Sequence, residues 1–227
     1  MTDQTHPSTH PWDDKSAQWY IDHYGNEPVH KIVPMLCQLQ DRQTIVDLGC
    51  GSGSVVSALA QQLSTGKVIG IDPTPKMIEV ARDHLAKCPA PFAVAVEFYQ
   101  TGAECLPLLD NSIDIAVAVS SLHHWGEVNT GLAEIMRVLK PQGRLVVIDE
   151  IWEEFAADIH TIIDQHGVDF EHMDHHDEFK TAEGVAAALV AAGFAEVSHK
   201  QHRQPKIAVS VVTGYKAATT TDSRSLS

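Results

Sequence analysis

The stretch Thr44-Ile-Val-Asp-Leu-Gly-Cys-Gly-Ser-Gly-Ser-Val55 decides the fold of this chain. It opens with a short, mostly apolar run that has the length of a buried strand, and the segment 55–63 after it has the spacing of an amphipathic helix. Three glycines alternate through the turn between them. Such a turn brings backbone N–H groups and a helix N-terminus close to a ligand. The pattern therefore predicts a ligand site here, with the carboxylate of Asp47 at the end of the strand.

A second apolar run, Val68-Ile-Gly-Ile-Asp72, also ends in an acid. It follows the glycines by about 20 residues, the spacing at which a carboxylate on the second strand meets the hydroxyls of a ribose. The dinucleotide fingerprint requires a further glycine where this chain has Ser54. The two runs indicate a nucleoside ligand, and Ser54 disfavours the alternative of a nicotinamide-dependent oxidoreductase, as does the lack of a second catalytic domain.

The Asp-x-Gly-x-Gly-x-Gly pattern resembles motif I of the class I S-adenosylmethionine (SAM) dependent methyltransferases. Three later segments continue the resemblance in the same order: Ala103-Glu-Cys-Leu-Pro-Leu108, Asn111-Ser-Ile-Asp-Ile-Ala-Val-Ala-Val-Ser-Ser-Leu-His-His-Trp125 and Arg137-Val-Leu-Lys-Pro-Gln-Gly143. The chain looks closest to the small-molecule, UbiE-like branch of this superfamily. The resemblance implies an α/β fold: a Rossmann-like, doubly wound, seven-stranded sheet with its last strand antiparallel, helices on both faces and a small cap insertion.

The resemblance also sets the expected domain organisation. We expect a methyltransferase domain at 12–216, in which 12–40 forms lid helices and 150–180 forms a substrate cap. The polar ends, 1–11 and 217–227, are expected to be disordered.

The hydrophobic pattern predicts the individual elements. Thr181 is the expected cap of the last helix, and Gly25 and Gly193 follow helices as terminators. A tight turn is expected at 140–143. The predicted helices are 11–24, 28–39, 55–63, 75–87, 131–139 and 185–192, and the predicted strands are 44–48, 68–72, 94–100, 113–119, 145–148, 195–202 and 207–212.

The resemblance implies a set of SAM-binding residues from the glycine turn, three strand ends and the N-terminal helix. In this set the turn holds the methionine end, Asp72 binds the ribose, and an aromatic ring of the lid faces the cationic sulfur; ordinary packing is the alternative role of the rings. The set is Asp47, Gly49, Cys50, Gly51, Gly53, Asp72, Pro73, Met77, Gly102, Ala103, Glu104, Ser120, Leu122, His123, Tyr20 and Tyr24. Many relatives carry an Asp at the position of Gly102, so the adenine contact is expected to depend on the Ala103 backbone or on Glu104.

Methyl transfer from a sulfonium is an in-line displacement, in which the protein mainly aligns the reacting atoms. A hydroxyl or protonated amine acceptor also needs a base, and histidine has a suitable unperturbed pKa. His123 and His124, after the fourth predicted strand, are one pair of candidates, with packing as their alternative role.

A second group of candidates lies in the acidic, His-rich cap. If its segment is helical, His172 and His176 share a face at i,i+4, the spacing at which two imidazoles can bind one metal ion, and His175 is a further weak metal candidate. One cap histidine could instead contact substrate, or the cap could be a solvated surface loop. The alternative functions are therefore a metal-assisted methyltransferase, another SAM chemistry, and a SAM-binding protein without turnover.

The composition of the chain limits the classes of partner that we expect. The 227 residues carry a formal charge of −14, and the 16 Lys and Arg residues are scattered, whereas a nucleic-acid reader needs a basic face. At 44% hydrophobic the chain can build a core, yet no apolar stretch reaches the length of a membrane span. We expect a soluble cytoplasmic protein, monomer or homodimer, with reduced cysteines, a small-molecule substrate, and no nucleic-acid or membrane partner.

Overall fold

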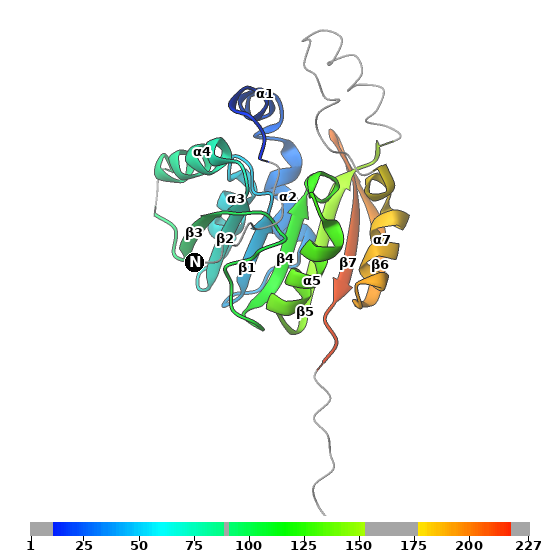
Figure 1. Ribbon diagram of the computed structural model, residues 1–227. Coiled ribbons are helices and arrows are strands. Elements are labelled where there is room, and N and C mark those ends of the chain that lie inside the picture. Colours follow the sequence, from blue (N-terminus) through cyan, green and yellow to red (C-terminus); the bar gives the residue numbers. More distant parts are fainter. Residues whose placement is uncertain (1–10, 89–90, 153–176, 219–227) are drawn as a thin grey trace, which may run out of the picture.

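The computed structural model describes residues 11–88, 91–152 and 177–218. Figure 1 shows the elements. The helices are α1 (Asp14–Tyr24), α2 (Pro28–Leu36), α3 (Ser54–Gln62), α4 (Pro75–Ala86), α5 (Val128–Val138) and α7 (Ala182–Ala191), with 3-10 turns η1 (Leu122–His124) and η3 (Asp177–Lys180). The strands are β1 (Thr44–Leu48), β2 (Lys67–Asp72), β3 (Ala95–Gln100), β4 (Ile113–Val119), β5 (Leu139–Glu150), β6 (Ala195–Gln204) and β7 (Ile207–Tyr215).

The strands form one sheet in the order β3-β2-β1-β4-β5-β7-β6. The first five run parallel, and β7 is antiparallel to both of its neighbours. The predicted seven-stranded, doubly wound sheet with an antiparallel last strand is confirmed. The strand order reverses between β1 and β4, and in open α/β sheets ligands bind in the crevice at this point, beyond the carboxyl ends of the strands.

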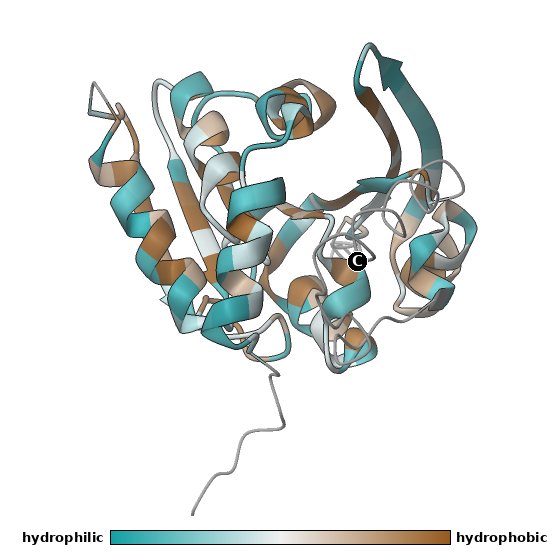
Figure 2. Cartoon of the chain, turned by 90° about the horizontal axis from the view of Figure 1, so that it is seen from above, coloured by the Kyte–Doolittle hydropathy of each residue, from teal (hydrophilic) through white to brown (hydrophobic). Residues whose placement is uncertain are grey.

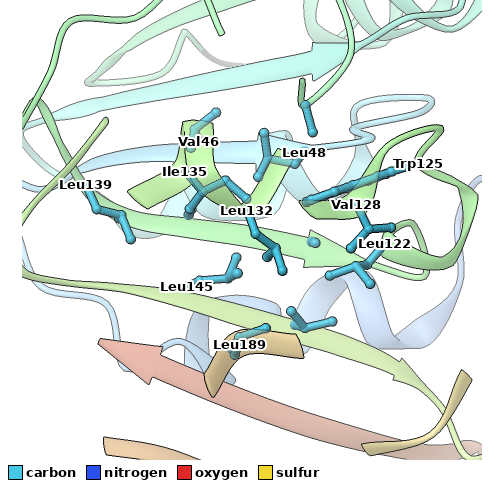
Figure 3. Close-up of a cluster of buried hydrophobic side chains, with 14 of the residues drawn as sticks. Val46, Leu48, Leu122, Trp125, Val128, Leu132, Ile135, Leu139, Leu145 and Leu189 are labelled. Carbon is cyan, nitrogen blue, oxygen red and sulfur yellow. The ribbon is translucent and has the colours of Figure 1, made fainter. Parts of the chain in front are cut away.

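Helices cover both faces of the sheet because neighbouring strand residues alternate between two cores. Val46 points to the face where Leu132 and Ile135 of α5 pack (Figure 3). Ile45 points to the opposite face, where Val33 of α2 and residues of α3 pack. Figure 2 shows the apolar strand segments lying between helices that turn polar residues outward. Burial on both faces explains why β1 and β4 read as nearly continuous apolar runs.

The observed boundaries differ from the predicted ones mainly around β5. This strand begins at Leu139, so the predicted turn at 140–143 lies within it. The pairing with β4 shifts there from Ile113–Leu139 to Ile115–Arg144, which is a bulge in β5. Helix α5 begins at Val128, three residues before the predicted start, since Val128 is buried in the same core as the later residues of α5.

The C-terminal elements follow the prediction with longer strands. β6 and β7 extend to Gln204 and Tyr215, so that the turn between them contains only residues 205 and 206. The side chain of Thr181 accepts a hydrogen bond from the N–H of Gly184, which confirms it as the cap of α7. A Cβ at Gly184 would lie 1.7 Å from the carbonyl oxygen of Glu178, so the close approach of η3 requires glycine there.

Several predictions fall outside the described residues: the N-terminal segment 1–10, most of the cap at 153–176, and the tail at 219–227. Within the described ranges no helix combines the length and the apolar composition that a membrane span needs.

Candidate functional site

The glycine turn between β1 and α3 curls back on the end of β2. The N–H groups of Gly49 and Cys50 both donate to the carbonyl of Ile71, at 2.8 and 2.9 Å. Gly49, Gly51 and Gly53 have φ angles of 74°, 50° and 77°, a region that favours glycine. A Cβ at Gly49 would also stand 2.6 Å from the Cβ of Ser121. The turn therefore needs glycine both for its backbone conformation and for contact with the end of β4.

Asp72 lies at the end of β2 with its carboxylate held by backbone donors. Its Oδ2 accepts from the N–H of Gly51 and its Oδ1 from the N–H of Thr74, each at 2.9 Å. Burial raises the pKa of this carboxyl to about 6 against the effect of these bonds. The bonds fix the orientation of the carboxylate beside the glycine turn, as a ribose-binding acid requires.

A cavity opens beside Asp72, with about 680 Å³ of empty space including its open mouth. Five segments far apart in the sequence meet around it. Its lining consists of Trp12, Tyr20, Gly49, Gly51, Asp72, Pro73, Thr74, Met77, Thr101, Gly102, Ala103, Glu104, Ser120, Ser121, His124, Trp125 and Gly126.

Aromatic residues of the N-terminal segment form one side of this cavity. The rings of Trp12 and Tyr20 meet edge to face at 5.3 Å, and Trp12 meets His124 in the same way at 5.2 Å. The backbone N–H of Trp12 donates to Thr74 Oγ1 at 3.1 Å, so the start of the segment is attached to the loop after β2. Figure 1 shows α1 beyond the carboxyl ends of the parallel strands.

A second, smaller cavity, with about 330 Å³ of empty space including its open mouth, lies on the other side of the glycine turn. It shares Tyr20, Gly49 and Gly51 with the first cavity, so the two adjoin. Asp47 and Cys50 line it, and Asp47 is only 1% exposed. Burial, and then the charge of Asp72, raise the pKa of Asp47 to about 8. A buried carboxyl group beside a glycine cradle is suited to a ligand that carries a hydrogen-bond donor or a positive charge.

The two adjacent histidines occupy different positions. His123 is 2% exposed and lies outside the walls of both cavities, with its Nδ1 2.7 Å from Oδ2 of the equally buried Asp149. His124 lines the larger cavity. Ser120, also in the wall, has a φ of 46° and donates through its Oγ to Oε1 of Glu150 at 2.8 Å. Burial and the nearby Asp149 raise the pKa of Glu150 to about 8.

The structure brings most of the expected SAM-binding residues to the two cavities. Gly53, Leu122 and Tyr24 do not line either one: Gly53 precedes α3, Leu122 is in the core, and Tyr24 packs against Tyr20 at 5.5 Å between ring centroids. The metal candidates His172, His175 and His176 lie outside the described residues.

Ala103 and Glu104, which follow Gly102, line the larger cavity, and Glu104 has a second contact. Glu104 Oε1 accepts from the backbone N–H of Glu127 at 3.1 Å, at the start of α5. Besides His124, six wall residues of the larger cavity are not in the expected SAM-binding set: Trp12, Thr74, Thr101, Ser121, Trp125 and Gly126. The aromatic density of segment 11–24 was the available signal for Trp12; the others depend on how the loops fold back.

Fold and site together define a Rossmann-like domain with a crevice at the position where ligands bind in open α/β sheets. Residues 46–147 match the family model described as a methyltransferase domain. Over 148 residues the chain is 35% identical to an O-methyltransferase of Penicillium expansum. The matched region covers 65% of this chain and 52% of that protein. Over 107 residues it is 37% identical to a demethylmenaquinone methyltransferase of Lactococcus lactis, covering 47% of this chain and 41% of that protein. A SAM-dependent methyltransferase of Aquifex aeolicus has the same fold, with a TM-score of 0.66 at 22% identity, over 91% of this chain and 100% of that one.

Over residues 46–147 the chain is similar to the class I SAM-dependent methyltransferases, including relatives of the UbiE-like branch. It spans 32%, 52% and 42% of the length of three curated relatives that it matches, so the similarity is that of a domain.

Proposed function

We propose that this protein transfers the methyl group of SAM to a small-molecule acceptor and releases S-adenosylhomocysteine. The observation that carries the proposal is the Asp72 carboxylate, held by two backbone N–H groups at the edge of a cavity that the glycine turn also lines. Relatives named as an O-methyltransferase and a demethylmenaquinone methyltransferase support a small acceptor.

The residues present fit SAM. Asp72 would hold the ribose hydroxyls, Thr101 to Glu104 would lie along the adenine, and the glycine turn would hold the methionine end. The bound SAM supplies an activated methyl group, so the chain has to align the acceptor and keep water out. Trp12 and Tyr20 form the aromatic wall that serves this purpose, and such rings also favour a cation.

An acceptor hydroxyl or amine would lose its proton to a group in the wall. His124 is the better candidate for this base, because its side chain lines the cavity whereas His123 is buried against Asp149. The cap histidines His172 and His176 remain alternatives, and with them the possibility of a metal-assisted reaction.

The test is calorimetric binding of S-adenosylhomocysteine to the wild type and to Asp72→Asn. The substitution removes the charge but keeps the shape of the side chain, and we expect affinity to fall by about 10- to 100-fold, the range for a lost charge-assisted hydrogen bond. Asp83→Asn, on the exposed face of α4, is the matched control and should bind as the wild type does. Absence of binding to the wild type would overturn the proposed function.

A further inference from the structure

We propose that His30 recognises the α-carboxylate of bound SAM and, together with Asp47, forms a receptor for the zwitterionic methionine end. The inference rests on the proposed function and adds a residue from α2 to it. It starts from two residues that line the same small cavity and each carry a buried polar atom without a hydrogen-bond partner among the described residues.

Both His30 and Asp47 line the smaller cavity behind the glycine turn. Asp47 Oδ2 and His30 Nδ1 are buried atoms without a hydrogen-bond partner among the described residues. Leaving a buried polar atom unsatisfied costs about 1–3 kcal/mol, so each such atom in a native protein needs an explanation. A ligand with one donor and one acceptor group, placed between the two, would satisfy both.

The chemistry of the cavity selects the kind of ligand. Asp47 can only accept hydrogen bonds once it is ionised, which suits an ammonium group. Among the described residues that line this cavity, His30 is the one that can become positively charged, which suits a carboxylate. The hydroxyls of Ser52 and Ser54 are already directed to the carbonyl of Gly25 and are not free to serve as the main carboxylate donors.

The two cavities adjoin along Tyr20, Gly49 and Gly51. A nucleoside held by Asp72 in the larger cavity can therefore extend its amino-acid end past the glycine turn into the smaller one. The α-amino acid of SAM carries an ammonium and a carboxylate on one carbon. Of the groups in SAM, this zwitterion is the one that matches an acidic and a basic side chain in a single small cavity.

Protonation states follow from the surroundings of each group. Burial lowers the pKa of His30 to about 4, although Glu150 acts in the opposite direction, and the phenol of Tyr20 shares its cavity. Burial, and then the charge of Asp72, raise the pKa of Asp47 to about 8.

In the protein without ligand near neutral pH, both groups of the pair are therefore uncharged. The zwitterion would favour an ionised Asp47 and a protonated His30, so that one group loses a proton and the other gains one. The proton released by Asp47 and the proton taken up by His30 should nearly cancel, so SAM binding to the wild type should cause little net proton uptake from this pair.

The first experiment compares SAM with decarboxylated SAM, which keeps the sulfonium and the ammonium but lacks the carboxylate. Calorimetry on His30→Ala should show SAM binding weakened by about 10- to 100-fold, with the affinity for decarboxylated SAM changed by less than about twofold. Retained binding of decarboxylated SAM also shows that the variant is folded. His199→Ala, on the exposed edge strand β6, is the matched control and should bind both compounds normally.

The second experiment measures proton exchange on SAM binding in buffers of different ionisation enthalpy, at pH 6.5. Relative to the wild type, Asp47→Asn should take up about one more proton, and His30→Ala should release about one more, because each variant keeps only one half of the exchange. Any proton exchanged by Asp72 is the same in all three proteins, so it does not affect the differences between them.

The outcomes separate the two proposals. If the wild type binds neither compound, the proposed function fails. The second case is that the wild type binds SAM, and His30→Ala lowers the affinity for SAM and decarboxylated SAM equally or changes neither affinity. The assignment of His30 is then wrong, while the proposed function stands. Proton uptake that is the same in all three proteins would also contradict the role of His30.

Discussion

At the scale of single residues, the site depends on positions where a side chain cannot be added. Gly49 combines a φ of 74° with contact to Ser121, whereas Gly193 has a φ of 90° and open space around it. The two glycines therefore separate the cost of a left-handed backbone from the cost of a collision.

We expect Gly49→Ala to lower the free energy of unfolding by about 2–4 kcal/mol, because the new methyl group meets Ser121 in addition to the backbone strain. Gly193→Ala should cost about 1–2 kcal/mol, the strain alone. Urea unfolding measures both differences. Equal losses in the two variants would show that the contact with Ser121 relaxes without cost.

At the scale of elements, α1 connects the N-terminal segment to the two cavities. Tyr20 projects from α1 into the walls of both, and the preceding Trp12 is hydrogen-bonded to the loop after β2. Little of α1 is fully buried: Ala17 is the only residue of the helix in that class. Few buried contacts make an element liable to local opening.

Ligand binding should therefore stabilise α1 more than other helices. We expect amide hydrogen exchange in Asp14–Tyr24 to slow by about tenfold or more when S-adenosylhomocysteine is bound, because Trp12 and Tyr20 gain a contact surface. Helix α7 covers the sheet near β6 and β7, and its exchange should change little. Equal slowing in α1 and α7 would indicate general stabilisation and contradict a lid.

At the scale of the whole molecule, the buried acids of the site affect folding. The pKa of Asp47 is raised by burial and by Asp72, from an ordinary value of 3.8 to about 8. A group with a raised pKa in the folded state stabilises the fold below its unfolded pKa, and this contribution is lost as pH rises through the folded pKa.

The ligand-free protein should therefore lose stability from Asp47 as pH rises from about 4 to about 8. Asp47→Asn cannot titrate, and its free energy of unfolding should fall less over this range, by an amount on the order of a few kcal/mol. Denaturant unfolding at pH 5, 7 and 9 gives the comparison. Parallel curves for the two proteins would mean that Asp47 is ionised in the ligand-free fold.

The sequence predicted the parts of the site that are local. The glycine turn and Asp72 follow apolar strands, and their conformation depends on neighbours in the chain, so spacing was enough to identify them. The hydrophobic pattern likewise predicted the individual strands and helices, and the family resemblance implied the sheet and its antiparallel strand. The start of α5 was missed because Val128 contributes to the core only through the tertiary packing of that helix.

What the sequence by itself determined was thus the class of fold, the glycine turn and the acid at the end of β2, because each is encoded in contiguous residues. Only the tertiary structure decided that Trp12 lies against His124, that His123 turns away to Asp149, and that His30 shares a cavity with Asp47. These pairs join residues separated by 17 to more than 100 positions in the chain. Their contacts depend on how the carboxyl ends of the strands converge and on where the N-terminal helices pack above them.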